Sequence, residues 1–278
     1  MKKFILRLSI FILPFVAFFA LNAIFYNPQE GDLVRIGYLY SNPTPKSLIK
    51  NRYELQRKYT LLSEIDIKTK KKFKVVTIGS SFSDQDSLGY QNFLDNKETP
   101  VLHIDNFFSK SDPTQFLVQL LNSKFFDSVR TDYILLNFSE RGFHKNLKKI
   151  DFNSTIDLDL MLSKNDKFPK NELNFFSSTT IKAPLANLQY PFTPNPIFSN
   201  TYKYQSKNNN LFSNSPEELL FYENDIKHMD VKNDTLSILR LIKTMNKIND
   251  MVAARSMELI LLISPDKYDL YYPFIKNN

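Results

Sequence analysis

The feature that most constrains the fold is an apolar run that ends in a glycine and a group of serines. Residues 75–78 form a β-branched stretch typical of a central parallel strand that is covered on both faces. We expect Gly79 to let the backbone turn without the steric penalty of a Cβ atom. The serines at positions 80, 81 and 83 are suited to cap a helix that runs through residues 88–94.

This arrangement would place Ser81 at the carboxyl end of a strand and beside a helix N-terminus. In open α/β sheets, ligands bind at that edge, and backbone N–H groups there stabilise an anion or a developing oxyanion. A Gly-Ser-Ser turn is, however, also an ordinary helix cap when it is taken alone. The stretch therefore predicts either a presented nucleophile or a plain cap.

Strand and helix patterns alternate along much of the chain. Residues 100–105 and 132–138 read as strands, and Asp112 with the following proline opens a helix in the favoured order. A long helix that begins at Asp234 precedes a fourth strand at residues 259–264. Because such alternation implies βαβ crossovers, we predict an α/β fold with a mostly parallel sheet and helices on both faces.

Two other segments interrupt this pattern. The basic start of the chain precedes an apolar run at residues 8–25, which at about 18 residues is near the minimum for a transmembrane helix. Because no good cleavage site follows, we favour an uncleaved anchor over a signal peptide. From about residue 146 to 230 prolines forbid long helices, and we expect an insertion with short elements of its own.

The predicted organisation is therefore an anchor at residues 1–26, a juxtamembrane segment at 27–71 and an α/β domain at 72–278. The anchor predicts a single-pass protein of the cell membrane whose body lies outside the cytoplasm, in the periplasm or at the cell surface. Cysteine is absent, which excludes disulfides, thiolate metal sites and cysteine nucleophiles. No pair of the 3 histidines has metal-ligand spacing, so we expect neither a metal nor another cofactor.

Basic residues exceed acidic ones, and the formal net charge is +7. The lysines are dispersed except for a dense run from Lys68 to Lys74. We interpret that run as a solvated loop that leads into the first strand, rather than as a nucleic-acid site. We therefore expect no nucleic-acid partner.

Three blocks resemble one family. The Gly-Ser-Ser-Phe-Ser sequence at 79–83 resembles the Gly-Asp-Ser-Phe-Ser nucleophile block of SGNH (GDSL-type) hydrolases, in their alginate O-acetyltransferase-like branch. The Glu140-Arg141 pair is similar to a Glu-Arg pair of that branch, and residues 264–271 resemble its Pro-x-Lys-x-x-x-Tyr block. Position 80 holds Ser instead of Asp, as in the related D-alanyl-transfer proteins of the cell envelope.

The resemblance implies a three-layer, flavodoxin-like domain in which a serine takes an acyl group, usually acetyl, and passes it to a sugar hydroxyl or to water. Ser81 matches the nucleophile. Lys267 and Tyr271 match the Lys–Tyr block and would either bind a saccharide or merely finish a strand. Glu140 and Arg141 would either bind substrate, because the cleft forms at the carboxyl edge of parallel strands, or form an ordinary exposed ion pair. We expect Gly79 and Asn137 near the oxyanion, because Asn137 ends the neighbouring strand and carries a side-chain N–H.

The general base is harder to assign. The family's Asp and His are expected after the Lys–Tyr block, but the chain ends a few residues beyond it, so we expect a C-terminally incomplete domain and a poor catalyst. His144 is the best internal substitute, because it follows Glu140 and Arg141 near the carboxyl edge of a strand. His103 lies within a strand and reads as a core or edge histidine, and His228 as a surface one.

Two functions follow from these expectations. The first is an extracytoplasmic acetyltransferase or esterase that acts on a cell-envelope polysaccharide, with an acyl-donor protein as a further partner. The second is a non-catalytic, membrane-tethered module that binds glycan or a partner protein. The serine block favours the enzyme, and the missing base favours the binding module.

Overall fold

The computed structural model describes residues 2–25, 55–109, 112–140, 150–163, 185, 188–189, 191–193, 200–207, 218–228 and 235–276. The chain divides into two compact units. One unit, which we call the sheet unit, comprises residues 54–168 and 231–266. The other, which we call the hairpin unit, comprises residues 1–53, 169–230 and 267–278.

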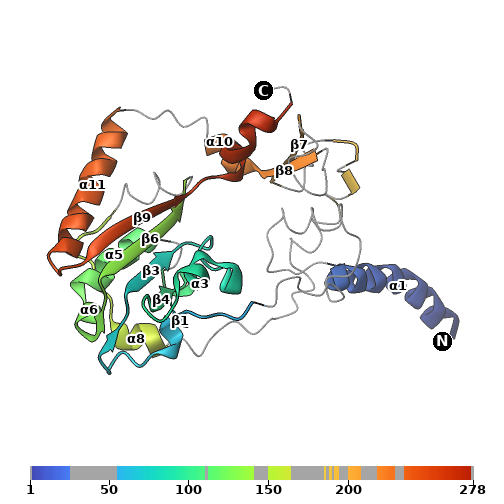
Figure 1. Ribbon diagram of the computed structural model, residues 1–278. Helices are drawn as coiled ribbons and strands as arrows, with labels where there is room; N and C mark the ends of the chain where they lie inside the picture. Colours follow the sequence, from blue (N-terminus) through green and yellow to red (C-terminus); the bar gives the residue numbers. More distant parts are fainter. Residues whose placement is uncertain are drawn as a thin grey trace. The chain divides into compact units, whose positions relative to one another are not determined.

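A five-stranded parallel sheet forms the centre of the sheet unit (Figure 1). Its strands, in spatial order, are β1 (Thr60–Leu61), β4 (Val101–Ile104), β3 (Val75–Gly79), β6 (Tyr133–Ser139) and β9 (Glu258–Ser264). Every residue of β3 is buried, as the apolar run at 75–78 predicts for a central strand. The prediction of an α/β fold with a mostly parallel sheet is confirmed.

The strand order creates a switch point beside β3. From β3 the chain crosses to β4 on one side, returns to β6 on the other side, and then continues outward to β9. In doubly wound folds with this order, the loops that follow the two strands at the reversal diverge and leave a crevice for a ligand. The segments after Gly79 in β3 and after Ser139 in β6 are therefore the natural place for a site.

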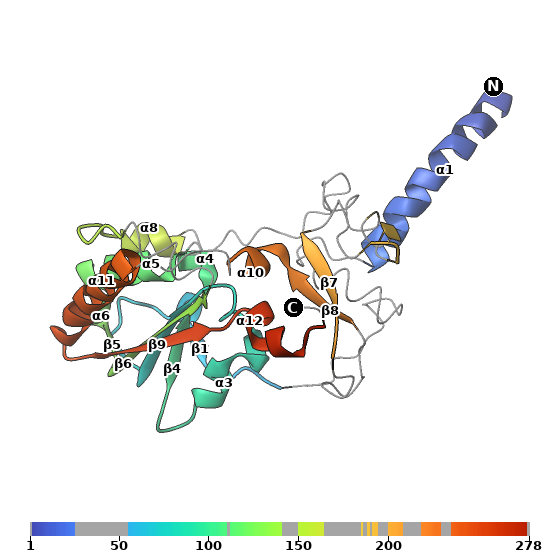
Figure 2. The same cartoon turned by 90° about the horizontal axis from the view of Figure 1, so that it is seen from above.

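Helices cover both faces of the sheet (Figure 2). One face packs against α5 (Pro113–Asn122), α8 (Leu158–Ser163) and α11 (Thr235–Ala253) in a continuous apolar core. The other face carries a smaller cluster around Tyr59, Val101 and Leu135, beside α3 (Tyr90–Leu94). The layering agrees with a three-layer α/β domain.

A sequence signal explains the start of α5, whereas Asp234, the predicted start of α11, lies outside the described residues. Asp112 caps α5 by accepting a hydrogen bond from the Gln115 N–H at 3.0 Å, and Pro113 follows it, as predicted.

The remaining short elements are η2 (Leu62–Glu64), β2 (Lys71–Lys72), η3 (Asp86–Leu88), α4 (Asn106–Ser109), α6 (Phe125–Ser128) and β5 (Val129–Arg130). Strands β2 and β5 pair in parallel as a separate two-stranded sheet.

One local prediction at the serine stretch is wrong. The serines at 80–83 do not cap a helix; they form a turn, and α3 begins only at Tyr90, after Gly89. Gly79 also has no positive φ. The serines form a turn because Ser83 points inward and donates a hydrogen bond to Asn137 on β6, whereas Gly79 is still part of β3.

The hairpin unit contains antiparallel strands β7 (Thr201–Gln205) and β8 (Glu218–Tyr222), followed by α10 (Glu223–His228). With α12 (Lys267–Tyr271) and η5 (Tyr272–Phe274), the hairpin encloses a small core of Leu219, Phe221, Tyr268 and Ile275.

The same unit includes α1 (Lys2–Phe25), which contains the apolar run at residues 8–25. The predicted transmembrane helix is not found there: among the helices of the described residues, none is long and apolar enough to cross a membrane.

Candidate active site

The turn after β3 is anchored to β6 at its start. The Ser80 N–H donates to the Asn137 carbonyl oxygen at 3.3 Å, and the Ser83 N–H closes the turn on the Ser80 carbonyl at 2.8 Å. Gly79 and Asn137 are register partners at the carboxyl ends of β3 and β6. Ser81 therefore follows the carboxyl edge of the sheet at the switch point, beside Asn137, as predicted.

Ser83 points into the protein. Its hydroxyl donates to Asn137 Oδ1 at 2.8 Å and lies 3.3 Å from the Tyr90 hydroxyl. A Cβ atom on Gly79 would meet Ser83 Oγ at 1.8 Å and Ser83 Cβ at 2.5 Å. The glycine is therefore required by the close approach of Ser83, not by its backbone angles.

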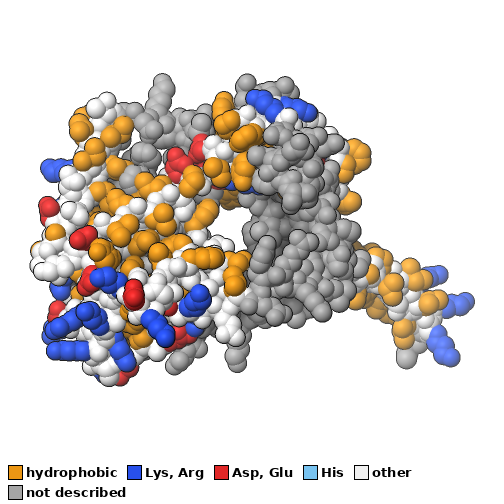
Figure 3. Space-filling model, in the orientation of Figure 1, with side chains coloured by type: hydrophobic (Ala, Val, Ile, Leu, Met, Phe, Trp, Pro, Cys, Tyr) orange, Lys and Arg blue, Asp and Glu red, His pale blue; other side chains and the backbone are white. Residues whose placement is uncertain are grey.

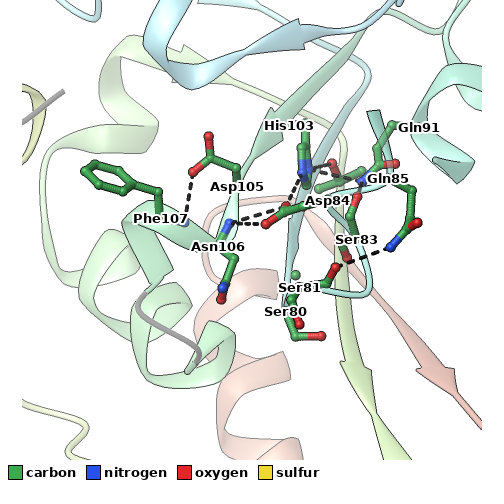
Figure 4. A network of polar contacts seen from close by, with 12 residues as sticks. Ser80, Ser81, Ser83, Asp84, Gln85, Gln91, His103, Asp105, Asn106 and Phe107 are labelled. Atoms are coloured by element: carbon green, nitrogen blue, oxygen red, sulfur yellow. Dashed lines mark hydrogen bonds and ion pairs between the residues drawn. The ribbon is translucent and has the colours of Figure 1, made fainter. Parts of the chain in front are cut away.

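Asp84, the next residue, binds a buried histidine. His103 of β4 is 1% exposed, and its Nε2 lies 3.1 Å from Asp84 Oδ1. The same carboxylate accepts the backbone N–H of Asn106, with Oδ2 at 3.1 Å. Figure 4 shows Asp84 between the His103 ring and Asn106, with Ser80 and Ser81 at the other end of the drawn network.

Both ring nitrogens of His103 are engaged. Nδ1 lies 2.9 Å from Thr77 Oγ1 and 3.2 Å from Gln91 Nε2. Because an amide nitrogen only donates, the network assigns Nδ1 as the acceptor and places the ring proton on Nε2, which donates to Asp84. This geometry fits the core histidine predicted from the sequence, and it leaves no ring nitrogen for a proton on Ser81.

Asn137 is held by three partners at the end of β6. Its side-chain oxygen accepts from Ser83, and its side-chain nitrogen donates to the Leu262 carbonyl at 3.1 Å and to Ser264 Oγ at 2.9 Å. Since both amide protons are used, Asn137 has none to offer to an oxyanion. Its side chain instead joins the ends of β3, β6 and β9, which corrects the expectation from sequence.

Ser81 differs from the serines on either side of it. Its side chain is exposed, and neither its hydroxyl nor its backbone N–H has a hydrogen-bond partner among the described residues. Its carbonyl does accept, from the Asp84 N–H at 3.4 Å. The turn is thus fixed by its backbone and by Ser83 and Asp84, while Ser81 is exposed.

Burial shifts two pKa values around this turn. Desolvation raises the pKa of Tyr90 to about 12, so its hydroxyl keeps its proton as a partner for Ser83. Burial, with the nearby charge of Asp84 as a second cause, raises the pKa of Asp105. Within the described ranges, no group of three His, Asp or Glu side chains is arranged to hold a metal ion.

The Glu-Arg block is described only at its first residue. Glu140 Oε2 accepts the Asp266 N–H at 3.3 Å, which links the chain after β6 to the chain after β9. Arg141 and His144 lie outside the described residues, and their predicted roles stay predictions.

Lys267 and Tyr271 lie in the hairpin unit, on α12. Lys267 Nζ donates to the Leu220 carbonyl at 2.9 Å and lies 5.5 Å from the centre of the Phe221 ring. Burial lowers the pKa of this lysine. Its contacts support a structural role within its own unit, and a shared site with Ser81 stays a prediction. His228 is the last residue of α10.

Comparison with protein-family models, with curated proteins and with solved structures found no match to this chain. The site therefore has to be understood from its own geometry.

Sequence reasoning missed the Asp84–His103 pair, its contact with Gln91, and the inward turn of Ser83. One signal was present: a polar histidine in the otherwise apolar strand at 101–104 has to be satisfied by partners. The identity of those partners depends on register, because Thr77 and His103 are paired across β3 and β4.

Proposed function

We propose that the sheet unit is a serine acyl-transfer domain of the SGNH type, with Ser81 as its nucleophile. The observation that carries the proposal is the exposed hydroxyl of Ser81 at the switch point, which has no hydrogen-bond partner among the described residues and lies between serines that are engaged in the turn. Ligands of doubly wound sheets enter at this place. A fixed turn with an exposed hydroxyl positions the nucleophile, which is the first requirement for attack on a bound ester.

The chemistry would proceed in two balanced steps. The Ser81 oxygen attacks the acyl carbonyl carbon and gives its proton to a base; the bond to the donor's oxygen breaks, and that oxygen leaves with the proton, so that an acyl ester of Ser81 remains. A sugar hydroxyl or water then gives its proton to the base and attacks this ester, and the Ser81 oxygen leaves and takes the proton back. The Ser81 N–H, which has no hydrogen-bond partner among the described residues, supports a role as an oxyanion donor, because it would lie close to a carbonyl that the Ser81 oxygen attacks.

The proposed reaction requires a base that takes the proton of the Ser81 hydroxyl. His103 is excluded by its two bonded nitrogens, so the proposed base is His144, as its place in the sequence indicates. A serine hydroxyl without an adjacent base is a weak nucleophile. The expected activity is low if His144 does not reach Ser81.

A second candidate is a non-catalytic module that binds glycan or a partner protein. Two observations favour it: the side-chain N–H groups of Asn137 are both used within the protein, and His103 has no free nitrogen. The substrate, an acetylated envelope polysaccharide, and the extracytoplasmic location rest on the sequence and the family resemblance alone.

Hydrolysis of 4-nitrophenyl acetate by the full chain separates the two candidates. For an enzyme, Ser81→Ala should abolish hydrolysis above the background rate, while the matched control Ser80→Ala retains most of it. His144→Ala should also abolish it if His144 is the base. Equal background rates in all four proteins would reject the enzyme and leave the binding module.

A further inference from the structure

A second concave region lies at the opposite edge of the central sheet from Ser81. It is a cavity of about 600 Å³ at the amino ends of β6 and β9, a size within the range of small-molecule sites. Its lining consists of three cationic, two acidic, two apolar and one hydroxyl side chain: Lys72, Arg130, Arg255, Asp127, Asp132, Phe126, Met257 and Thr131.

The two carboxylates of the lining are already compensated. Arg255 Nη1 lies 3.3 Å from Asp127 Oδ1, and its Nη2 donates to the Leu121 carbonyl at 2.8 Å. Asp132 accepts from Lys74 Nζ at 2.6 Å, and Lys74 holds the pKa of Asp132 below its usual range. Arg255 is therefore fixed in place, and the acidic groups do not balance the other cations.

Lys72 and Arg130 are the least compensated cations of the lining: the charge of Lys72 also lowers the pKa of Asp132, but that carboxylate is already paired with Lys74. Both are exposed, and among the described residues neither makes an ion pair. They are register partners in the parallel pair β2–β5, so two positive side chains stand opposite each other on the same face. Like charges directly across a strand pair are destabilising, and an anion bound between them would turn that repulsion into attraction.

The surrounding surface strengthens the positive field. Lys68, Lys70 and Lys71, from the basic run noted in the sequence, are also exposed. Figure 3 shows Lys and Arg side chains gathered at the lower left, below α6 in the view of Figure 1. An excess of positive charge around a cavity raises the local concentration of anionic ligands.

We infer that this cavity binds a small ligand with several anionic oxygens, phosphate or carboxylate, through Lys72, Arg130 and Arg255. Phe126 and Met257, both almost fully buried, would supply apolar contact to the body of the ligand. The planar guanidinium groups suit paired anionic oxygens, and Lys72 adds a point charge. This inference does not rest on the role proposed for Ser81.

Isothermal titration calorimetry with the full chain tests it. The probes are inorganic tripolyphosphate and a galacturonic acid trimer, which separate phosphate from carboxylate recognition. Saturable binding of at least one probe is expected, and it should weaken as salt rises. Lys72→Gln with Arg130→Gln should weaken binding about tenfold or more. The matched control, Lys97→Gln with Lys243→Gln, removes equal charge from exposed positions elsewhere and should bind like the wild type.

Three results would overturn the inference. The first is that neither probe binds saturably. The second is that the Lys72/Arg130 and Lys97/Lys243 variants lose equal affinity for the probes. The third is that a DNA duplex binds more tightly than either probe and that the Lys72/Arg130 substitutions remove this binding. Relief of repulsion predicts that the unliganded Lys72/Arg130 variant melts at the same temperature as the wild type or higher. If it melts lower, the charge-preserving pair Lys72→Arg with Arg130→Lys decides: retained binding supports the inference, and lost binding rejects it.

Discussion

The two edges of the central sheet use polar side chains in opposite ways. At the carboxyl edge, Ser83 binds Asn137 and Asp84 binds His103, while the Ser81 hydroxyl has no partner among the described residues. At the amino edge, each carboxylate of the cavity is paired, but Lys72 and Arg130 make no ion pair with another described residue. Hydrogen bonds within the protein organise the carboxyl edge, and the amino edge carries an excess of positive charge.

This difference indicates which kind of ligand each edge would bind. A fixed turn with an outward hydroxyl favours chemistry on a neutral acyl group, which requires position more than charge. A concave region with surplus cations favours an anion, and it costs stability while it is empty. Substitutions at the carboxyl edge should therefore destabilise the protein, and neutral substitutions at the amino edge should not.

The largest effect is expected at Gly79. A methyl group there would overlap Ser83, which would have to leave its site and lose its hydrogen bond to Asn137. Gly79→Ala should therefore lower the free energy of unfolding by about 3 kcal/mol or more, measured by urea denaturation.

The matched control for Gly79→Ala is the Ser83→Gly background, which removes the atoms that the methyl group would meet. Gly79→Ala should cost much less in that background than in the wild type. Equal costs in both backgrounds would mean that Ser83 does not fill the space over Gly79.

A pH effect is expected from Tyr90. Its pKa is about 12 in the folded protein and 10.0 without burial, so the folded state holds this proton more tightly. The corresponding stability is fully present below about pH 10 and is lost as the pH rises toward 12, to a total of about 2 to 3 kcal/mol. Urea denaturation of wild type and Tyr90→Phe across this range should give a flatter profile for the variant, and parallel profiles would contradict the burial of the hydroxyl.

The two nearby serines should respond differently to the same change. Ser83→Ala removes a buried donor to Asn137 and should cost about 1 to 2 kcal/mol of unfolding free energy. Ser81→Ala removes an exposed, unbonded hydroxyl and should change that free energy by less than about 0.5 kcal/mol. A reversed order would show that Ser81, and not Ser83, holds the turn.

The smallest effect is expected at the amino edge. A double-mutant cycle of Lys72→Gln and Arg130→Gln should give a repulsive coupling energy of about 0.2 to 1 kcal/mol at low salt, since the two charges are register partners. The coupling should fade as salt is added, because both side chains are exposed. An attractive coupling would remove the contrast between the two edges.

Much of the sheet could be predicted from the sequence, because β3, β4 and β6 carry the apolar runs of covered parallel strands and are buried. The apolar run of β9 also predicted a strand, although Ile260, Leu261 and Ile263 are exposed. The helix cap at Asp112 could also be predicted from the sequence, because Asp followed by Pro is a common helix start. The two-residue strand β1 and the β2–β5 pair could not be predicted, since strands that short have no periodicity.

The site was less predictable because long-range contacts decide it. Ser83 and Asn137 are 54 residues apart, and their hydrogen bond determines that the serine stretch forms a turn. Local propensity favours a helix cap at the same residues. The unbonded amino-edge cations likewise appear only when β2 and β5 pair and place Lys72 beside Arg130.

Labelling with a fluorophosphonate probe tests the central claim, that Ser81 is a nucleophile at the switch point, most directly. The full chain is incubated with the probe, digested, and its modified serine is mapped by mass spectrometry. The account predicts modification at Ser81, loss of labelling in Ser81→Ala, and retention in Ser80→Ala. Labelling that persists in Ser81→Ala, or a folded wild type that takes up no probe, would contradict it.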